Sequence, residues 1–350
     1  MIRFIKYIIY NYRKIYLFPL WLPLFILSIP YRMIIILQRK KGYRNASLDI
    51  FLIGVGNITV GGTGKTEVVA YLTEFLKKWS KPAVILRGYK SEIKKPEIVK
   101  PRLNSSLTGD EALLLANRFP SVPVIIARKR IEGLPLVQKQ KRDCAVLDDA
   151  FQHWNIRCDL NIVLIDYTDP FGNGHLIPAG ILREPLSALR DADLILITKY
   201  EKTGTEEPLL QLEEKIRLYN SDSPLFVSHY GFSSVLHKGK PVPMKKVRNK
   251  RLLVLCGIGN PVYFFLMVKK HLSPVNCKMI QFTDHHKYTA KDIKTIKSKL
   301  KKNFDYVITT EKDNIKLKDL KFDPLVLKIG LKVPEEKKML QIIQKRMKSK

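Results

Sequence analysis

A glycine-rich stretch has the residue types and spacing that bind phosphate. It reads GVGNITVGGTGKT from Gly54 to Thr66, after an apolar run and before an amphipathic segment. Glycines let backbone N–H groups converge on phosphate oxygens, and a helix that starts there adds partial positive charge. Lys65 would reach the β- and γ-phosphates of a nucleotide, and the Thr66 hydroxyl would ligate Mg²⁺. The strict GxxxxGK[ST] pattern fails because Thr59 replaces its first glycine. We predict phosphate binding at Thr59, Gly61, Gly62, Thr63, Gly64, Lys65 and Thr66.

Two pairs of acids could serve phosphoryl transfer, which needs a metal ligand and a group that orients or deprotonates the acceptor hydroxyl. Asp148 and Asp149 end an apolar run, as in a Walker-B strand, and such strand ends face the nucleotide crevice of a parallel sheet. They could instead cap a helix. Asp110 and Glu111 begin a predicted helix, and by itself that pattern is more typical of an N-cap than of a catalytic site.

Short apolar runs alternate with helical segments after residue 45, and this alternation predicts the scaffold. Continuous β-branched runs separated by helices are typical of a parallel, doubly wound α/β sheet. Glu67–Trp79 and Asp110–Arg118 have helical periodicity. The predicted strands are Ile50–Val55, Ala83–Leu86, Val122–Ile126, Ala145–Leu147, Leu160–Ile165 and Leu194–Ile197.

A second, smaller α/β set follows a polar stretch at 201–222 and a basic one at 237–251, which we interpret as a connection or an exposed ribbon. Its strands are Leu252–Cys256, Lys278–Phe282, Tyr306–Thr309 and Leu325–Leu327, and a basic amphipathic helix, Glu335–Lys350, ends the chain. With 350 residues and 45% hydrophobic content, the chain is large enough for two domains. We predict an N-terminal anchor at 1–45, a P-loop lobe at 46–225 and a smaller lobe at 226–350. Two such lobes commonly form an active site in the cleft between them.

The N-terminal region is apolar enough to enter a membrane. Residues 15–31 carry no charge, basic residues flank them, and Pro19, Pro23 and Pro30 would kink a helix there. We predict an anchor that spans the bilayer or lies in its interface, rather than a buried core helix or a cleaved signal peptide. The balanced flanks give no orientation, but a site for ATP must face the cytoplasm. The inner (cytoplasmic) membrane is therefore the expected location.

The net charge of +30 suits a polyanionic partner: nucleic acid, an anionic membrane or a phosphorylated substrate. A lysine-rich surface that serves only solubility is the simpler alternative. Cysteine usage indicates a reducing compartment, because Cys144, Cys158, Cys256 and Cys277 form no CxxC pair.

Eight motifs together resemble the tetraacyldisaccharide 4'-kinase family of P-loop kinases along almost the whole chain. DDAFQH and GNGHLIPAGILREP have no general structural reason to occur together, so their combination is specific. The motifs are GNITVGGTGKT (56–66), LRGYK (86–90), TGDEALLLA (108–116), LDDAFQH (147–153), FGNGHLIPAGILREP (171–185), CGIGNPVYFF (256–265), FTDHH (282–286) and TTEKDNIKL (309–317).

The resemblance implies transfer of the ATP γ-phosphate to the 4'-hydroxyl of a tetraacylated glucosamine disaccharide 1-phosphate, which gives lipid IVA in lipid A synthesis. It implies that Asp110 is the base or orients the acceptor, with help from His285, although His286 beside it leaves that assignment open. It places Thr66, Glu111, Asp148, Asp149 and Gln152 near Mg²⁺, with Asp149 as the nearer acid. It assigns phosphate or substrate contacts to Lys65, Arg130, His153, Asn173, Arg183 and Glu184.

Two other classes compete with a membrane-bound, monomeric lipid kinase. A nucleotide switch that is specific for GTP would require an [NT]KxD element, and a metallochaperone would require a cysteine-rich metal motif. The nearest stretch, Thr198–Glu201, lacks the aspartate. A nucleic-acid-dependent ATPase fits the charge, but the chain has no recognisable nucleic-acid-binding signature and carries the apolar segment. We therefore expect the lipid substrate and the membrane as partners, and no nucleic acid.

Overall fold

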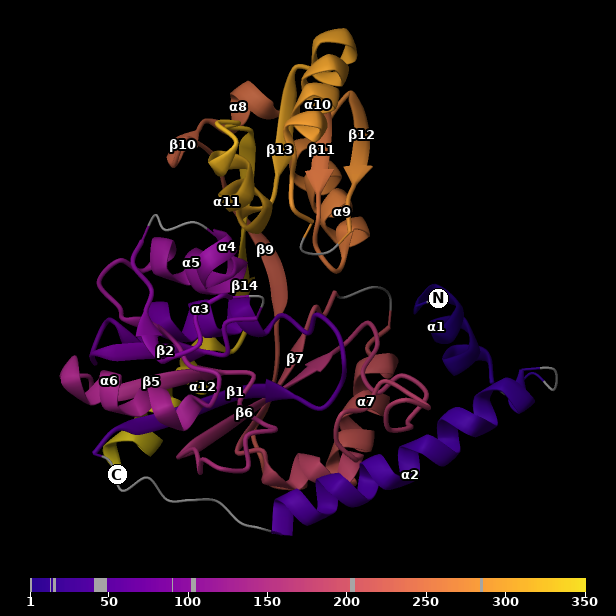
Figure 1. Ribbon diagram of the computed structural model, residues 1–350, viewed down its shortest axis with the longest axis vertical. Helices are drawn as coiled ribbons and strands as arrows, with labels where there is room; N and C mark the ends of the chain where they lie inside the picture. Colours follow the sequence, from indigo (N-terminus) through magenta and orange to yellow (C-terminus); the bar gives the residue numbers. More distant parts are fainter. Residues whose placement is uncertain are drawn as a thin grey trace. The chain divides into compact units, whose positions relative to one another are not determined.

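The chain folds into two compact units, which the computed structural model describes over most of their length (Figure 1). The first unit comprises Met1–Ile85, Lys129–His229 and Lys332–Lys350, and the second Leu86–Arg128 and Tyr230–Leu331. The three-part division predicted from the sequence stays a prediction; residues 86–128 cluster here with the second unit. The described residues are 2–12, 14, 17–40, 49–89, 91–101, 105–201, 205–283 and 286–350.

A parallel sheet forms the centre of the first unit, as predicted. Its strands lie in the order β2-β5-β1-β6-β7-β8, and each neighbouring pair is parallel. Both faces are covered, so the central strands are buried along nearly their whole length, which is why they read as continuous apolar runs. The strands are β1 (Phe51–Asn57), β2 (Pro82–Leu86), β5 (Cys144–Asp148), β6 (Leu160–Asp166), β7 (Leu194–Thr198) and β8 (Leu225–Val227).

Helices α3 (Lys65–Leu76), α6 (Leu134–Lys139), α7 (Glu207–Arg217) and α12 (Glu336–Lys348) complete this unit, with short 3₁₀ turns at Arg130–Gly133 and Leu186–Asp191. Helix α7 lies within the stretch that we interpreted only as polar. Helix α12 buries Met339, Leu340 and Ile343, so its apolar face is used by the fold rather than left for another surface.

Two N-terminal helices, α1 (Ile2–Asn11) and α2 (Phe18–Lys40), also belong to the first unit. One side of α2 packs inward: Trp21 is buried beside Ala179, and its Nε1 donates to the Ala179 carbonyl at 2.8 Å. Other apolar side chains are exposed, among them Ile26 (56%), Met33 (54%) and Leu37 (56%). By length and composition the helix could cross a membrane.

The second unit has its own six-stranded sheet, in the order β10-β9-β14-β13-β11-β12. Strands β11, β12, β13 and β14 form parallel pairs, whereas β9 and β10 form an antiparallel hairpin that leads into the basic stretch. The strands are β9 (His229–His237), β10 (Lys240–Val242), β11 (Arg251–Cys256), β12 (Asn276–Gln281), β13 (Tyr306–Thr309) and β14 (Leu325–Lys332).

Helices connect these strands, and a short segment from earlier in the chain belongs to the same unit. That segment holds the antiparallel pair β3 (Glu97–Ile98) and β4 (Val124–Ile126), with α4 (Ser105–Thr108) and α5 (Asp110–Arg118) between them. Helix α5 packs on α11. The remaining helices are α8 (Met244–Val247), α9 (Pro261–Leu272), α10 (Ala290–Asn303) and α11 (Glu311–Asp319).

Candidate active site

The glycine-rich loop connects β1 to α3, which is the strand–loop–helix context that a phosphate-binding loop requires. Gly61 and Gly64 have φ values of 132° and 89°, which side chains disfavour, so these two positions need glycine. Thr59, at the position of the usual first glycine, is 3% exposed, and Asn57 Nδ2 donates to its carbonyl at 2.7 Å. The departure from the strict pattern is therefore accommodated by a fixed, buried threonine.

Lys65 begins α3 and lies beside both a neutral and an acidic partner. Its Nζ donates to Asn57 Oδ1 at 3.0 Å and lies 3.5 Å from Asp149 Oδ1. Thr66 follows on the first turn and is partly exposed. The cation predicted to reach the phosphates is thus next to an acid predicted to serve the metal.

Asp149 stands at the end of β5 in an unusual backbone conformation. Its φ is 51°, in the left-handed region that aspartate tolerates better than most residues. Arg183 binds the carboxylate with both Nη atoms, at 2.8 and 3.2 Å. Burial disfavours the charged form, but the Arg183 hydrogen bonds and the nearby charges of Lys65, Arg183 and Arg130 outweigh it and lower the pKa of Asp149. Asp149 is therefore anionic at neutral pH.

Arg130 and Gln152 fix the backbone around the acid pair. The Arg130 side chain is 1% exposed and donates to the Asp148 carbonyl from Nη2 at 2.8 Å and Nε at 3.2 Å. Gln152 Nε2 donates to the Asn57 carbonyl at 2.7 Å, which ties β1 to the segment after β5. Asp148 is 6% exposed, and His153 is partly exposed just beyond Gln152.

The donor set in this unit suits Mg²⁺. No cluster of three His, Cys, Asp or Glu side chains occurs among the described residues. Mg²⁺ does not need one, because it is usually held by one or two carboxylates together with phosphates and water. Gln152 Oε1 is buried and accepts no hydrogen bond from any described residue. Together with the Thr66 hydroxyl and the Asp148–Asp149 pair, it supplies oxygen ligands of the kind this ion prefers.

Two residues at the end of β7 support the loop, and sequence reasoning missed this role. Thr198 Oγ1 donates to the Thr63 carbonyl at 2.8 Å. Lys199, in a left-handed conformation, donates from Nζ to the Gly62 carbonyl at 2.6 Å and pairs with Asp166. In the sequence this stretch resembles only an incomplete nucleotide-specificity element, and its lysine is the signal that could have identified the support.

The predicted substrate residues after β6 lie against the N-terminal helices. Tyr31 of α2 donates to the Arg183 carbonyl at 3.0 Å, and Arg39 Nε donates to Glu184 Oε2 at 2.9 Å. Asn173 Nδ2 donates to the carbonyls of Ile9 (3.0 Å) and Ala179 (2.8 Å). Burial raises the pKa of the Glu184 carboxyl, although Arg39 opposes the shift. The segment that supplies Arg183 to Asp149 is thus held by the apolar helix.

In the second unit, Asp110 is the first residue of α5 rather than its N-cap. Gly109 occupies the cap position, with φ 80° and no side-chain capping bond, so the N-cap interpretation of Asp110 is wrong by one residue. Asp110 Oδ2 lies 3.4 Å from Lys316 Nζ, and Glu111 Oε1 lies 3.7 Å from Lys312 Nζ.

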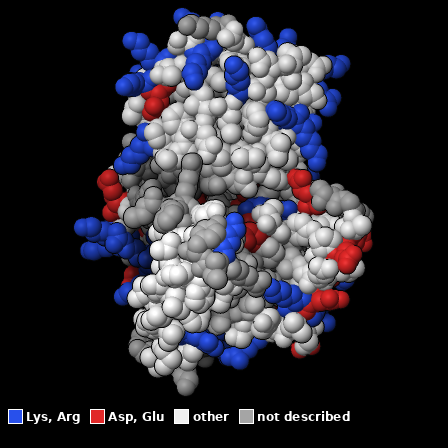
Figure 2. Space-filling view, turned by 90° about the vertical axis from the view of Figure 1, so that its right-hand side faces the viewer, with Lys and Arg blue, Asp and Glu red and all other residues white. Residues whose placement is uncertain are grey.

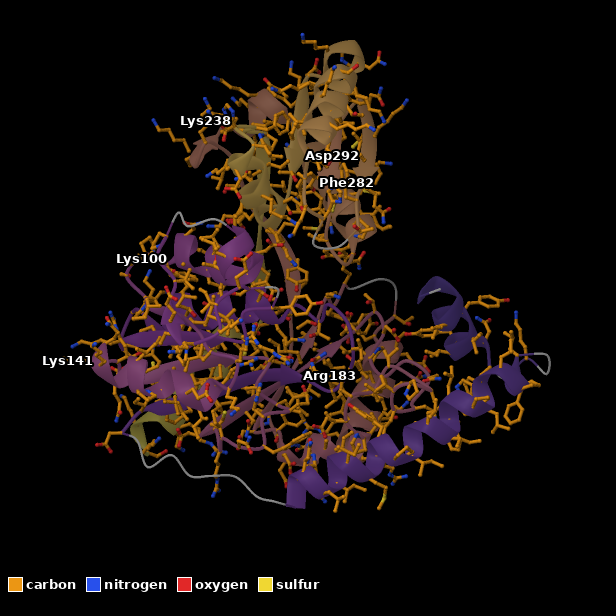
Figure 3. The ribbon with its side chains drawn as sticks, viewed as in Figure 1. Lys100, Lys141, Arg183, Lys238, Phe282 and Asp292 are labelled. Atoms are coloured by element: carbon orange, nitrogen blue, oxygen red, sulfur yellow. The ribbon has the colours of Figure 1, made fainter. Side chains whose placement is uncertain are left out.

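The predicted partner of Asp110, His285, lies outside the described residues. Its neighbour His286 donates from Nε2 to Asp292 Oδ2 at 3.2 Å and stacks on Phe282 at 4.4 Å between ring centroids. Phe282 and Asp292 lie close together in Figure 3. His286 is therefore held by local contacts, which favour a structural duty for it.

Comparisons with known proteins agree with these motifs. A family model described as tetraacyldisaccharide-1-P 4'-kinase, LpxK, matches residues 20–348. A tetraacyldisaccharide 4'-kinase of Halothermothrix orenii is 35% identical over 321 residues, which cover 84% of this chain and 83% of that protein. One of Syntrophus aciditrophicus is 32% identical and covers 94% of each chain. The crystal structure of "apo" form LpxK from Aquifex aeolicus in complex with ATP is 28% identical, covers 94% of this chain and 99% of that one, and has a TM-score of 0.74.

Replacing Lys199 by methionine should weaken ATP binding about tenfold, because it removes a charged hydrogen bond to the loop at Gly62. Titration calorimetry with ATP measures the effect. Lys141→Met is the matched control, since Lys141 is also left-handed but exposed. Equal affinities in the two variants would show that Lys199 does not support the loop.

Proposed function

The chain belongs to the tetraacyldisaccharide-1-P 4'-kinase family, and we propose that its glycine-rich loop, with the acids that end β5, holds ATP and Mg²⁺ in that reaction. The chain is an ATP-dependent kinase of lipid A biosynthesis. It transfers the γ-phosphate to the 4'-hydroxyl of a tetraacyldisaccharide 1-phosphate and so forms lipid IVA. The alternative of a nucleotide switch or metallochaperone is not favoured.

The contact between Lys65 and Asp149 carries the proposed roles on the nucleotide side. A cation 3.5 Å from an acid at the end of the neighbouring strand joins the phosphate-binding and metal-binding parts of a P-loop site. Lys65 would stabilise charge that develops on the transferring phosphoryl group. Thr66, Asp148, Asp149 and Gln152 would supply oxygen ligands to Mg²⁺ or to its water shell, and Glu111 is proposed to act near the ion. Arg130, buried under Asp148, would keep that acid in place.

On the acceptor side, Asp110 is proposed to orient or deprotonate the 4'-hydroxyl, with His285 as its assistant. Arg183 and His153 are proposed substrate or phosphate contacts. Asn173 and Glu184 are proposed to shape the substrate site, because their side chains already bind the backbone and Arg39. Of these proposed roles, that of Asp110 is the most direct to test, because a base must be ionised to accept the hydroxyl proton.

We also propose that the protein is attached to the inner membrane with its catalytic units on the cytoplasmic face, where ATP is available. The exposed apolar side chains of α2 support attachment, and an acylated substrate requires access to a bilayer. We propose a monomer that binds no nucleic acid. On the face that Figure 2 draws, Lys and Arg are scattered rather than gathered into one stripe. Light scattering of the detergent-solubilised protein and filter binding with RNA test these two statements.

Replacing Ile26, Met33 and Leu37 together by glutamine should release the protein from anionic lipid vesicles. Each exposed side chain would lose about 1.5–3 kcal/mol of apolar burial, and the inward contacts of Trp21 remain. Vesicle co-sedimentation measures the partition. The control replaces the exposed Leu210 and Leu218, which lie outside α2. If the triple variant sediments like the control, α2 does not attach the protein.

Incubating the purified protein with γ-labelled ATP and the acylated disaccharide 1-phosphate should give a doubly phosphorylated lipid. Lys65→Ala should abolish the product, because it removes the cation beside the transferring phosphate. Thin-layer chromatography of the labelled lipid provides the measurement. Near-normal turnover by that variant would remove the glycine-rich loop from the mechanism.

Asp110→Asn should lower kcat by roughly 10²–10⁴-fold, because an amide cannot accept the hydroxyl proton. ATP affinity should stay within about twofold, since the loop at Gly61–Thr66 is unchanged. The melting temperature controls for folding. A folded, fully active variant would exclude Asp110 as the base.

A further inference from the structure

The motif TTEKDNIKL forms the start of α11 and contacts two other motifs of the second unit. One face of α11 meets α5 through three ion pairs. These are Glu311–Arg118, Lys312–Glu111 at 3.7 Å and Lys316–Asp110 at 3.4 Å. The first two of these pairs already connect α5 with α11. Packing of α5 on α11 therefore does not explain why the third pair buries Lys316 against Asp110.

Lys316 is unusual because lysine side chains are mostly exposed, whereas this one is almost fully buried. Its side chain is 7% exposed, against 11% for Asp110 and 0% for Asp313. Its Nζ lies 3.4 Å from an oxygen of each acid and 5.6 Å from the centre of the Tyr288 ring. It makes no hydrogen bond within the part of the chain that the structure describes. A buried ammonium stays charged only beside opposite charge, which these two carboxylates supply.

Asp313 holds Lys316 in place, because its own carboxylate is fixed by hydrogen bonds. Its Oδ2 accepts from the backbone N–H of Gly257 at 2.9 Å and from the Thr310 hydroxyl at 2.8 Å, and its own N–H donates to that hydroxyl at 3.0 Å. The carboxylate is thus held by the first turn of α11 and by the end of β11. Lys316, one turn further along α11, is held between this immobile acid and Asp110.

We propose that Lys316 is a positioning residue that holds the Asp110 carboxylate in the orientation that the acceptor hydroxyl requires. The inference rests on the proposed role of Asp110 as base. A cation 3.4 Å from the carboxylate, itself held by the immobile Asp313, favours one orientation of the Asp110 side chain at the start of α5. Among the described residues, Tyr288 and the pair of Glu111 with Lys312 also lie beside this site.

The experiment compares Lys316→Met with Lys318→Met, a lysine on the same helix that is exposed to solvent. In Lys316→Met kcat should fall roughly tenfold, as part of the general-base contribution is lost. The KM for the lipid and the Kd for ATP should not change, because an interaction that acts only on the reacting hydroxyl lowers kcat alone. Lys316→Arg should restore part of the rate, and Lys318→Met should retain the wild-type rate.

A second variant covers the case in which Lys316→Met does not fold, since Asp313 would then be a buried, uncompensated charge. Lys316→Met with Asp313→Asn removes that charge and should show the same loss of kcat. A folded variant with the kcat of the wild type would overturn the proposal. If Asp110→Asn is slow in the same assays, only the role of Lys316 fails. A fully active Asp110→Asn would instead remove the base assignment itself.

Discussion

The ion pairs of the Asp149 carboxylate connect the parts of the candidate site in the first unit. It lies in a left-handed backbone conformation at the end of β5, between the cations of Lys65 and Arg183. Lys65 belongs to the helix that follows the glycine-rich loop, whereas Arg183 belongs to the segment that α2 holds through Tyr31. One partly buried anion therefore connects the nucleotide loop, the central sheet and the helix with the exposed apolar side chains.

Asp149 carries one negative charge between two cations. In the proposed mechanism, phosphate oxygens of the nucleotide would compete for Lys65, and Mg²⁺ would compete for the carboxylate. The loop must keep its shape during this exchange. Thr198 and Lys199 provide that support by binding the carbonyls of Thr63 and Gly62, so the backbone N–H groups stay available for phosphate.

Local patterns predicted the strands, the phosphate-binding loop and the helix over Asp110–Arg118, because burial on both faces and helical periodicity leave direct traces in the sequence. The long-range contacts were not predictable from those traces. Thr198 and Thr63 are 135 residues apart in sequence, and α2 meets residues more than 150 positions away. The start of α5 was also not predictable to the residue. The sequence pattern does not distinguish an N-cap from the first helical residue, and in the structure Gly109 is the N-cap and Asp110 the first residue of the helix. The roles assigned to individual site residues stay predictions.

A double-mutant cycle between Arg183→Met and Asp149→Asn tests the central claim most directly. The measured quantity is kcat with the acylated disaccharide 1-phosphate at saturating ATP and Mg²⁺. If the two side chains act as one unit, each single variant is slow and the double variant loses much less than the product of the two losses. Fully multiplicative losses would contradict the account, because Arg183 and Asp149 would then act independently.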